Sequence, residues 1–272
     1  MDLSSSSPLP LLPDAARGEL HALRRPRQGL RLCLCAPDQE ALQAQFGQGR
    51  GVLVVTPNLD HLRLLHRSAA LRRAYAGAEV VLNDSRFLDR LCLKGRALTL
   101  PGSELAPLML ARAPAGTRAL VVGCDEAVKA DLRARYPSVA FTFIEPSMGF
   151  IRRRPERRDL VRAALAAAPD LAFVCTGAPQ SELLAAQFKR AGLKADILCC
   201  GSAFRFLAGA ATRAPAWTRK LGAEWAWRFL CEPRTRKRYV ADALFLLRRA
   251  PAFLALRLKG RARFGRYEIG LG

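Results

Sequence analysis

Several common sequence signatures are missing from this 272-residue chain, and each absence narrows what the chain can be. No uninterrupted apolar stretch reaches the roughly 20 residues that a membrane-spanning helix needs. The eight cysteines contain no CxxC pair, so they indicate neither a zinc site nor a dithiol redox motif, and buried thiols in a reducing cytosol account for them better. No strand-like run is followed by GxGxxG, which argues against a dehydrogenase.

The first residues also lack the pattern of a signal peptide. They read MDLSSSSPLPLLPD, with no basic segment before the apolar part and with prolines inside it. We therefore expect residues 1–28 to form a disordered tail. A main domain over residues 29–215 and an appendage over residues 216–272 would follow it.

Acidic residues are scarce relative to basic ones. The chain has 23 Asp and Glu against 44 Lys and Arg, a net charge of +21. Such a charge implies an anionic partner, which could be nucleic acid, acidic lipid or a phosphorylated ligand, although a GC-rich genome also favours arginine. Between Arg205 and Arg266, sixteen basic residues stand against three acidic ones, so +13 of the total lies at the C-terminal end. Aromatic residues are only 7% of the chain and no nucleic-acid motif is present, so we expect no nucleic-acid partner.

Short apolar runs alternate with helical patterns. This alternation predicts an α/β fold, a Rossmann-like parallel sheet with helices on both faces. The runs are apolar on both sides, as in a sheet that is covered on both faces. The expected strands are Leu30–Cys35, Val52–Val55, Glu79–Leu82, Ala119–Val122, Ala140–Phe143, Leu171–Cys175 and Asp196–Cys199. The expected helices are Asp60–Ala76, Ser103–Arg112, Glu126–Tyr136, Glu156–Ala167 and Ser181–Ala191.

Beyond Trp217 the pattern becomes helical and basic. Leu244 and Leu247 stand beside Arg248 and Arg249 in an amphipathic pattern that suits a membrane surface. Each basic residue close to anionic lipid adds about 1 kcal/mol to binding. The alternative is a helical hairpin that packs on the body and exposes a solvated basic face.

Polar residues follow the ends of two predicted strands, where ligands bind in sheets of this kind. Thr56 and Asn58 flank Pro57, which fixes a turn and leaves a hydroxyl and an amide exposed. Asp84 comes just after the next strand. On the residues alone, Asp84 is either a helix N-cap or a carboxylate free for chemistry.

Glycine-containing loops precede further helices. Gly177 and Pro179 follow a strand and precede a helix that begins near Glu182, an arrangement that lets a backbone approach a ligand closely. Gly201 opens a similar turn after the last strand. Ser103, after a Pro-Gly turn, is predicted to be a helix N-cap.

The stretch from Gly201 to Tyr239 reads GSAFRFLAGAATRAPAWTRKLGAEWAWRFLCEPRTRKRY. It resembles the end of the conserved domain of the WecG/TagA/CpsF glycosyltransferases, glycosyltransferase family 26. The resemblance extends from about Leu53 to Tyr239 and includes the Thr-x-Asn turn and the PSMGF loop at residues 146–150.

The resemblance implies an inverting, metal-independent transfer of sugar from a UDP-sugar to a polyprenyl-diphosphate-linked saccharide. Asp84 would be the general base, and no cofactor would be needed. The absence of an Asp-x-Asp pair, the usual carrier of a metal-bound sugar nucleotide, fits this interpretation. The sugar transfer would take place at the cytoplasmic face of the bacterial inner membrane, in exopolysaccharide or cell-surface polysaccharide synthesis. The substrate-binding residues expected are Thr56, Asn58, Ser103, Gly177, Pro179, Glu182, Gly201, Arg205, Arg234, Arg236 and Arg238.

The departures of the chain from the family pattern include three that bear on activity. Arg205 stands where the family has an aspartate, Gln180 where it has a basic residue, and Ser181 where it has glutamine. These changes motivate a second hypothesis, a catalytically weak membrane-bound partner in a polysaccharide assembly complex. The donor sugar stays open, as does a homo-oligomeric state.

Overall fold

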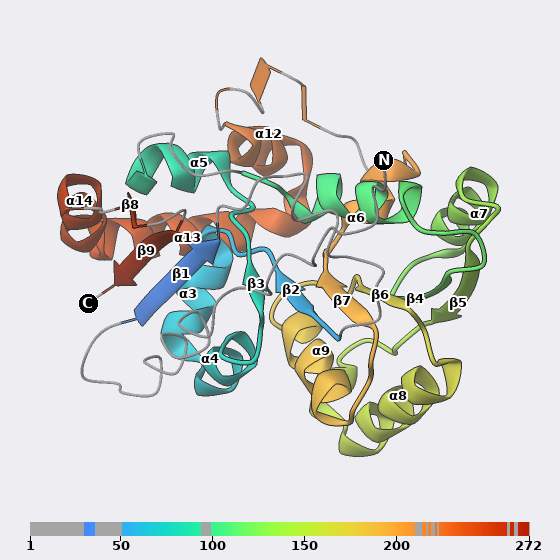
Figure 1. Cartoon of the computed structure of the whole chain (residues 1–272). Helices are drawn as coiled ribbons and strands as arrows, with labels where there is room; N and C mark the ends of the chain where they lie inside the picture. The colour runs from blue at the N-terminus through green and yellow to red at the C-terminus, as the bar shows by residue number, and fades with distance from the viewer. Residues whose placement is uncertain are drawn as a thin grey trace, which may run out of the picture.

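Figure 1 shows the fold of the whole chain, obtained as a computed structural model. The structure describes residues 30–35, 51–93, 99–209, 214–215, 217–218, 221, 223–259, 262–263 and 266–271. The predicted tail over residues 1–28 lies outside these residues, as does the side chain of Arg234.

A six-stranded sheet forms the centre of the molecule, with the order β3-β2-β7-β6-β4-β5. Every pair of neighbouring strands in it is parallel. The strands are β2 (Leu53–Val55), β3 (Val80–Val81), β4 (Arg118–Val122), β5 (Ala140–Ile144), β6 (Leu171–Val174) and β7 (Asp196–Cys199). The predicted α/β, Rossmann-like class is therefore confirmed.

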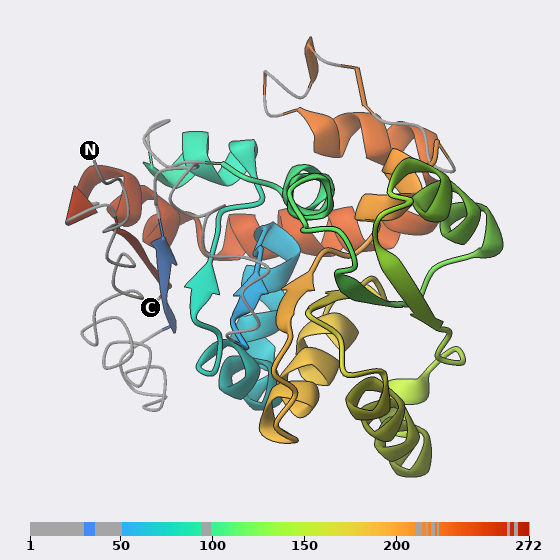
Figure 2. The ribbon, with the colours of Figure 1, turned by 45° about the vertical axis from the view of Figure 1, so that its right-hand side comes forward.

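Helices cover both faces of the sheet, as Figure 2 shows. Successive strand residues enter different cores: Leu53 and Val55 join one apolar cluster and Val54 joins the other, because side chains alternate along a strand. The first cluster is covered by α3 (Leu59–Arg67), α4 (Ala69–Tyr75), α8 (Arg154–Ala167) and α9 (Gln180–Arg190). The second is covered by α6 (Gly102–Ala111), α7 (Glu126–Arg135) and α10 (Ala203–Leu207). Shorter elements lie between them: α5 (Arg86–Leu88), the π-helix η3 (Asp89–Leu93) and the 3₁₀ turn η4 (Phe150–Arg152).

The helix predicted over Asp60–Ala76 is two helices, so that prediction was wrong at Ser68. This residue has an extended backbone, with φ −115° and ψ 107°, and ends α3. Its hydroxyl accepts a hydrogen bond from the N–H of Leu71 at 3.1 Å and so caps α4. A serine side chain that competes for backbone groups breaks an otherwise continuous apolar period.

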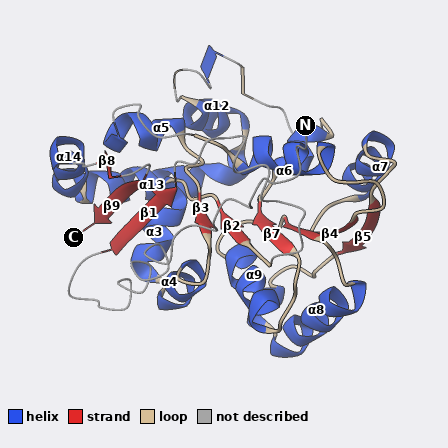
Figure 3. Cartoon of the chain, in the orientation of Figure 1, coloured by secondary structure: helices blue, strands red, loops and turns tan. Residues whose placement is uncertain are grey.

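The first strand, β1 (Leu30–Cys35), has the predicted bounds but not the predicted partners. It pairs antiparallel with β9 (Arg266–Leu271), which also pairs with β8 (Ala262–Arg263), in a separate small sheet. Figure 3 shows this sheet beside the C-terminal helices. A local pattern predicts a strand but not its partner, which here lies more than 230 residues away along the chain. No pattern in the sequence indicated β8 and β9 either, within an appendage predicted to be helical.

The C-terminal helices pack on the body of the protein. They are α12 (Glu224–Cys231), the 3₁₀ turn η5 (Pro233–Thr235), α13 (Arg236–Arg248) and α14 (Ala250–Lys259). Phe245 and Phe253 are 7% and 3% exposed and join the first core cluster, and Asp242 of α13 forms an ion pair with Arg63 of α3 at 2.6 Å. Leu244 and Leu247 remain exposed beside them. Within the described residues, no helix combines the length and apolar character needed to cross a membrane.

Candidate active site

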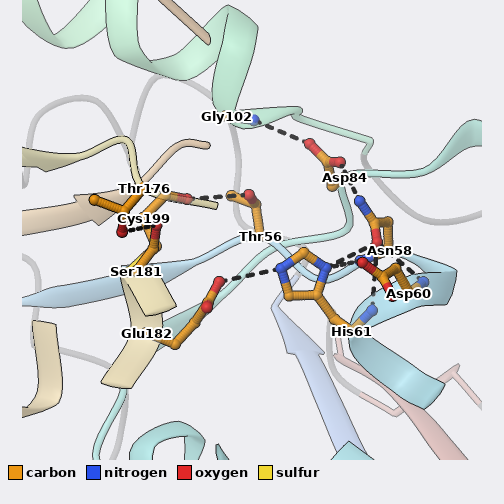
Figure 4. A network of polar contacts seen from close by, with 10 residues as sticks. All are labelled: Thr56, Asn58, Asp60, His61, Asp84, Gly102, Thr176, Ser181, Glu182 and Cys199. Carbon is orange, nitrogen blue, oxygen red and sulfur yellow. Dashed lines mark hydrogen bonds and ion pairs between the residues drawn. The ribbon is translucent and has the colours of Figure 1, made fainter. Parts of the chain in front are cut away.

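Polar side chains that follow β2 and β3 meet those of α3 and α9 at the carboxyl edge of the sheet, as Figure 4 shows. Thr56, just after β2, is buried, and its hydroxyl donates to the carbonyl oxygen of Cys199 at 3.5 Å. Asn58, Asp84 and Glu182, all predicted from the sequence, lie beside it in one network. The parallel strands explain this meeting, because their carboxyl ends share one edge.

Asn58 is the N-cap of α3, and the cap decides where its amide points. Its Oδ1 accepts from the backbone N–H groups of Asp60 at 3.1 Å and His61 at 3.4 Å. With the oxygen held by the helix, Nδ2 is the group that reaches Asp84, donating to Oδ2 at 3.2 Å. The helix start therefore fixes a donor against the candidate base.

The second oxygen of Asp84 is held by a backbone group. Its Oδ1 accepts from the N–H of Gly102, the first residue of α6, at 3.2 Å. The following helix, α5, is capped by Ser85, whose hydroxyl accepts from the N–H of Leu88 at 3.2 Å. The N-cap alternative for Asp84 is therefore wrong, and the carboxylate is directed into the network instead.

Two opposed effects act on the Asp84 carboxyl. Burial raises its pKa above the ordinary aspartate value, because the ionised form loses hydration. The positive charge of His61 and the hydrogen bonds from Asn58 and Gly102 act in the other direction, as does the more distant charge of Arg228. A raised pKa with several stabilising partners is typical of a carboxylate that accepts a proton during a reaction.

His61 links Asn58 to Glu182. Its Nδ1 lies 2.8 Å from Asn58 Oδ1, and its Nε2 lies 3.1 Å from Glu182 Oε1. Both oxygens are acceptors, so each of these two contacts is a hydrogen bond when the ring nitrogen that makes it carries a proton. The backbone N–H of Asn58 donates to Nδ1 at 3.3 Å when that nitrogen is unprotonated, which completes a capping box at the start of α3.

The carboxylates around His61 favour its protonated form. Burial by itself would lower the pKa of His61, but the hydrogen bond and charge of Glu182, with the charges of Asp60 and Asp84, raise it above the ordinary histidine value. Glu182 is 3% exposed, and its Oε2 has no hydrogen-bond partner among the described residues. His61 is thus the partner that the structure shows for this buried carboxylate.

The loops that contain Gly177 and Gly201 lie at the carboxyl edge of the sheet, and the first of them positions Glu182 there. Gly177 has φ +78°, a left-handed conformation that favours glycine, and Pro179 precedes the first residue of α9. This loop positions Glu182 in the first turn of α9, where its carboxylate reaches His61. Gly201, with φ +53°, makes the corresponding turn between β7 and α10.

Ser103 does not have the predicted capping role. Helix α6 begins at Gly102 with Pro101 at the N-cap, and no side chain caps it. The Asp84 carboxylate meets the Gly102 N–H instead, so a group distant in sequence satisfies this helix start.

The predicted arginines lie outside the network of Figure 4. Arg205 is more than half exposed, and its Nε lies 3.8 Å from Asp125 Oδ2. Arg236 is exposed and donates to the last carbonyls of α12, those of Phe229 and Leu230, at 3.0 and 3.1 Å. Arg238 stacks on Tyr239, with 4.9 Å from its guanidinium carbon to the ring centre.

The profile of the glycosyl transferase WecG/TagA/CpsF family matches residues 36–262. The chain belongs to this family. It is also similar to the N-acetylglucosaminyldiphosphoundecaprenol N-acetyl-beta-D-mannosaminyltransferase of Bacillus subtilis (strain 168), with 28% identity over 121 residues. That alignment covers 44% of this chain and 45% of the relative, so it spans less than half the length of either protein.

Two members of the network in this WecG/TagA/CpsF chain, and one charged residue that acts on Asp84 from outside it, were not predicted as site residues. His61 lies three residues after Asn58, in the first turn of α3, so its side chain faces the Thr-x-Asn turn. This spacing could have identified His61 from the sequence. Gly102 acts through its backbone N–H, which no side-chain pattern reveals. Arg228 of α12 pairs with Glu224 at 2.6 Å and places its guanidinium 4.6 Å from the ring centre of Phe206. The position of Arg228 in the helix that begins within the Leu-Gly-x-Glu-Trp motif could have identified it from the sequence.

Replacing Gly102 by alanine should weaken both the fold and the site. A Cβ there would lie 3.1 Å from the Cα of Cys200 and 3.3 Å from the Thr56 hydroxyl, so α6 and its neighbours must move apart by a few tenths of an ångström, which disturbs the contact of the Gly102 N–H with Asp84. Overpacking of this kind costs about 1–3 kcal/mol of unfolding free energy, measurable by urea denaturation. Gly77→Ala is the matched control, since a Cβ there makes only ordinary contacts at 3.5 Å and beyond. Equal stabilities of the two variants would contradict the expectation.

Proposed function

We propose that this chain is an inverting glycosyltransferase. It would move a sugar from a UDP-sugar to a polyprenyl-diphosphate-linked saccharide in bacterial exopolysaccharide or cell-surface polysaccharide synthesis. The observation that carries the proposal is the Asp84 carboxylate, held between the Asn58 amide and the Gly102 N–H at the carboxyl edge of the sheet. Membership of the WecG/TagA/CpsF family supports it.

In the proposed reaction, Asp84 takes the proton of an acceptor hydroxyl as the oxygen of that hydroxyl attacks the anomeric carbon of the donor. The bond from the anomeric carbon to the diphosphate breaks on the opposite face, and UDP leaves with the electron pair, which inverts the configuration. A general base of this kind contributes about 10²–10⁴ in rate. Asn58 and Gly102 hold the carboxylate so that a lone pair can face the acceptor.

The departing diphosphate needs positive charge near it. We assign this role to Arg205 of α10 and to Arg234, Arg236 and Arg238 of the appendage, and we propose that no metal and no cofactor take part. Arg205, Arg236 and Arg238 are partly or fully exposed, so they can turn toward a ligand at modest cost. Arg234 belongs to the same basic run.

The same comparison and the surface support our proposal for the acceptor and the location. The name of the Bacillus subtilis relative describes a diphosphoundecaprenol-linked saccharide, and we propose a polyprenyl-diphosphate-linked acceptor here. We place the protein at the cytoplasmic face of the inner membrane as a peripheral protein. Exposed apolar side chains on the appendage support this placement, namely Leu230, Leu244, Leu247 and Leu254.

A second candidate is a catalytically weak membrane-bound partner of a polysaccharide assembly complex. Two departures from the family pattern favour it. Arg205 pairs with Asp125 where the family has an aspartate, and Ser181 contacts Thr176 at 3.2 Å where the family has a glutamine. Both changes alter groups near the carboxyl edge of the sheet.

Release of UDP separates the two candidates. The wild-type protein is incubated with a panel of UDP-sugars and with membranes that carry lipid-linked acceptor, in the presence and absence of EDTA. We expect UDP release with one donor, dependent on the acceptor and unaffected by EDTA. A requirement for a divalent cation would contradict the metal-independent step. Membrane binding without UDP release from any donor would favour the non-catalytic partner.

A further inference from the structure

A cavity with basic residues in its lining lies between α3 and α13, apart from the candidate active site. It has a volume of 240 Å³, and its lining includes His66 and Arg67 at the end of α3 with Arg248 and Arg249 at the end of α13. Its apolar part includes Phe245, and no carboxylate belongs to the lining. His66 lies eight residues along the helix from Asn58, about 12 Å at 1.5 Å per residue, so this cavity is separate from the Asp84 network.

The basic residues that line this cavity are not needed to satisfy the carbonyl groups at the C-terminus of α3. The last carbonyls of α3 are already satisfied by Arg72, whose Nη1 donates to the carbonyl oxygens of Leu65 at 2.7 Å and His66 at 3.3 Å. Helix C-termini are where cations otherwise find a partner. The end of α3 therefore does not account for the basic residues that line the cavity.

The nearby acidic residues are also engaged. Asp60 of α3 and Asp242 of α13 both pair with Arg63, one turn away from the cavity. In the part of the chain that the structure describes, no ion pair joins Arg67 or Arg248 to a carboxylate. An anion that enters the cavity would supply the missing negative charge.

The arginines around the cavity act on the pKa of His66. His66 accepts a hydrogen bond from the guanidinium of Arg249. Burial lowers the pKa of His66, and the positive charges of Arg249, Arg72 and Arg67 lower it further. The neutral form of the ring is therefore favoured, and the arginines are the cations that would face an anion.

Exposed leucines adjoin the cavity and indicate the source of that anion. Leu244, which lines it, is 48% exposed, Leu247 on the next turn of α13 is 71% exposed, and Leu254 of α14 is 57% exposed. A small soluble phosphate would leave these side chains in water. An anion that carries acyl chains would cover them and neutralise the arginines together.

We propose that this cavity binds the phosphate of an anionic membrane phospholipid, with Arg67 and Arg248 as the phosphate contacts and the leucines of α13 and α14 against the acyl chains. The proposal rests on the membrane association proposed above and not on the transfer chemistry. It gives the basic appendage one defined lipid contact in addition to its general charge.

The test is co-sedimentation with vesicles of phosphatidylcholine, with or without phosphatidylglycerol. The wild type is compared with Arg67→Gln/Arg248→Gln and with the matched control Arg158→Gln/Arg190→Gln, which removes the same charge from exposed positions on α8 and α9. We expect the cavity variant to bind phosphatidylglycerol vesicles about 25-fold more weakly than the control, since it loses two contacts and each contact near anionic lipid is worth about fivefold. Equal binding by the two variants would overturn the proposal.

Two further measurements distinguish the lipid site from a soluble-phosphate site and from a defect in sugar transfer. Binding of glycerol phosphate, followed by calorimetry, should be far weaker than vesicle binding, and an equal affinity would assign the cavity to a soluble phosphate ester. UDP release with a short-chain, detergent-soluble acceptor should be the same in the cavity variant and the wild type. If the wild type releases no UDP but the vesicle result holds, the proposed function fails while the lipid site stands.

Discussion

Asp84→Asn should lower the rate of sugar transfer by about 10²–10⁴ while leaving the protein folded. Asparagine has the same shape, and its carbonyl oxygen can still accept from the Gly102 N–H, but its amide nitrogen then faces the Asn58 Nδ2 donor and that hydrogen bond is lost. It cannot take a proton from an acceptor hydroxyl. The loss should therefore appear in kcat and not as a failure to fold.

The protein should stay folded because a second effect offsets the lost Asn58 hydrogen bond, and this effect comes from the raised pKa of Asp84. A carboxyl whose pKa is higher in the folded than in the unfolded protein destabilises the fold once the pH is above both values, because the ionised form is less favourable in the folded state. Removing the charge removes that penalty. The same shift predicts that kcat/KM of the wild type falls as the pH drops through the raised pKa of Asp84.

Initial rates of UDP release and thermal unfolding at neutral pH measure the two effects. Asp159→Asn on the exposed face of α8 serves as the control for loss of one carboxylate. Undiminished UDP release by Asp84→Asn would remove Asp84 from the role of base. A large loss of stability would show that its carboxylate is structural.

The sequence could predict the residues of this site that depend on local order along the chain. Thr56, Asn58 and Asp84 each follow an apolar strand, and strand ends in a parallel sheet share one edge. Glu182 came from the resemblance of its loop to the family. These four residues do meet in the structure.

The rest of the site depends on contacts that no local pattern encodes. The partner of His61 lies 121 residues away, and the Asp84 carboxylate is held by a backbone N–H 18 residues away. The same limit applies to the fold. Strand β1 was found by its apolar pattern, but its pairing with β9 joins opposite ends of the chain.

His61→Ala should cost about 3–5 kcal/mol of unfolding free energy at neutral pH, because it leaves the buried Glu182 carboxylate without its partner. Glu182→Gln should cost less, since a glutamine oxygen can still accept from the ring. In the double variant the penalty of the unpaired carboxylate is gone. Its loss of stability should therefore be smaller than the sum of the two single losses.

The pH dependence has a definite sign. The pKa of His61 is raised in the folded protein, so the stability from its charge is fully present below the unfolded value of about 6.5. That stability is lost as the pH rises through the raised folded value. The difference in unfolding free energy between the wild type and Glu182→Gln should therefore shrink with increasing pH. Urea denaturation across this range measures it, with the exposed pair Arg118–Asp170 as a control that should show little coupling.

Additive losses in the double variant would mean that His61 and Glu182 do not act as a charged pair. If the losses are coupled as expected, the double variant also separates folding from positioning. Its fold recovers relative to His61→Ala, but Asn58 Oδ1 has still lost the His61 Nδ1 contact at 2.8 Å. Asn58 Oδ1 is then held by the two backbone N–H groups of the helix cap. A transfer rate that stays low in this stabilised variant would show that His61 positions the Asn58–Asp84 pair, because a purely structural role would recover with the fold.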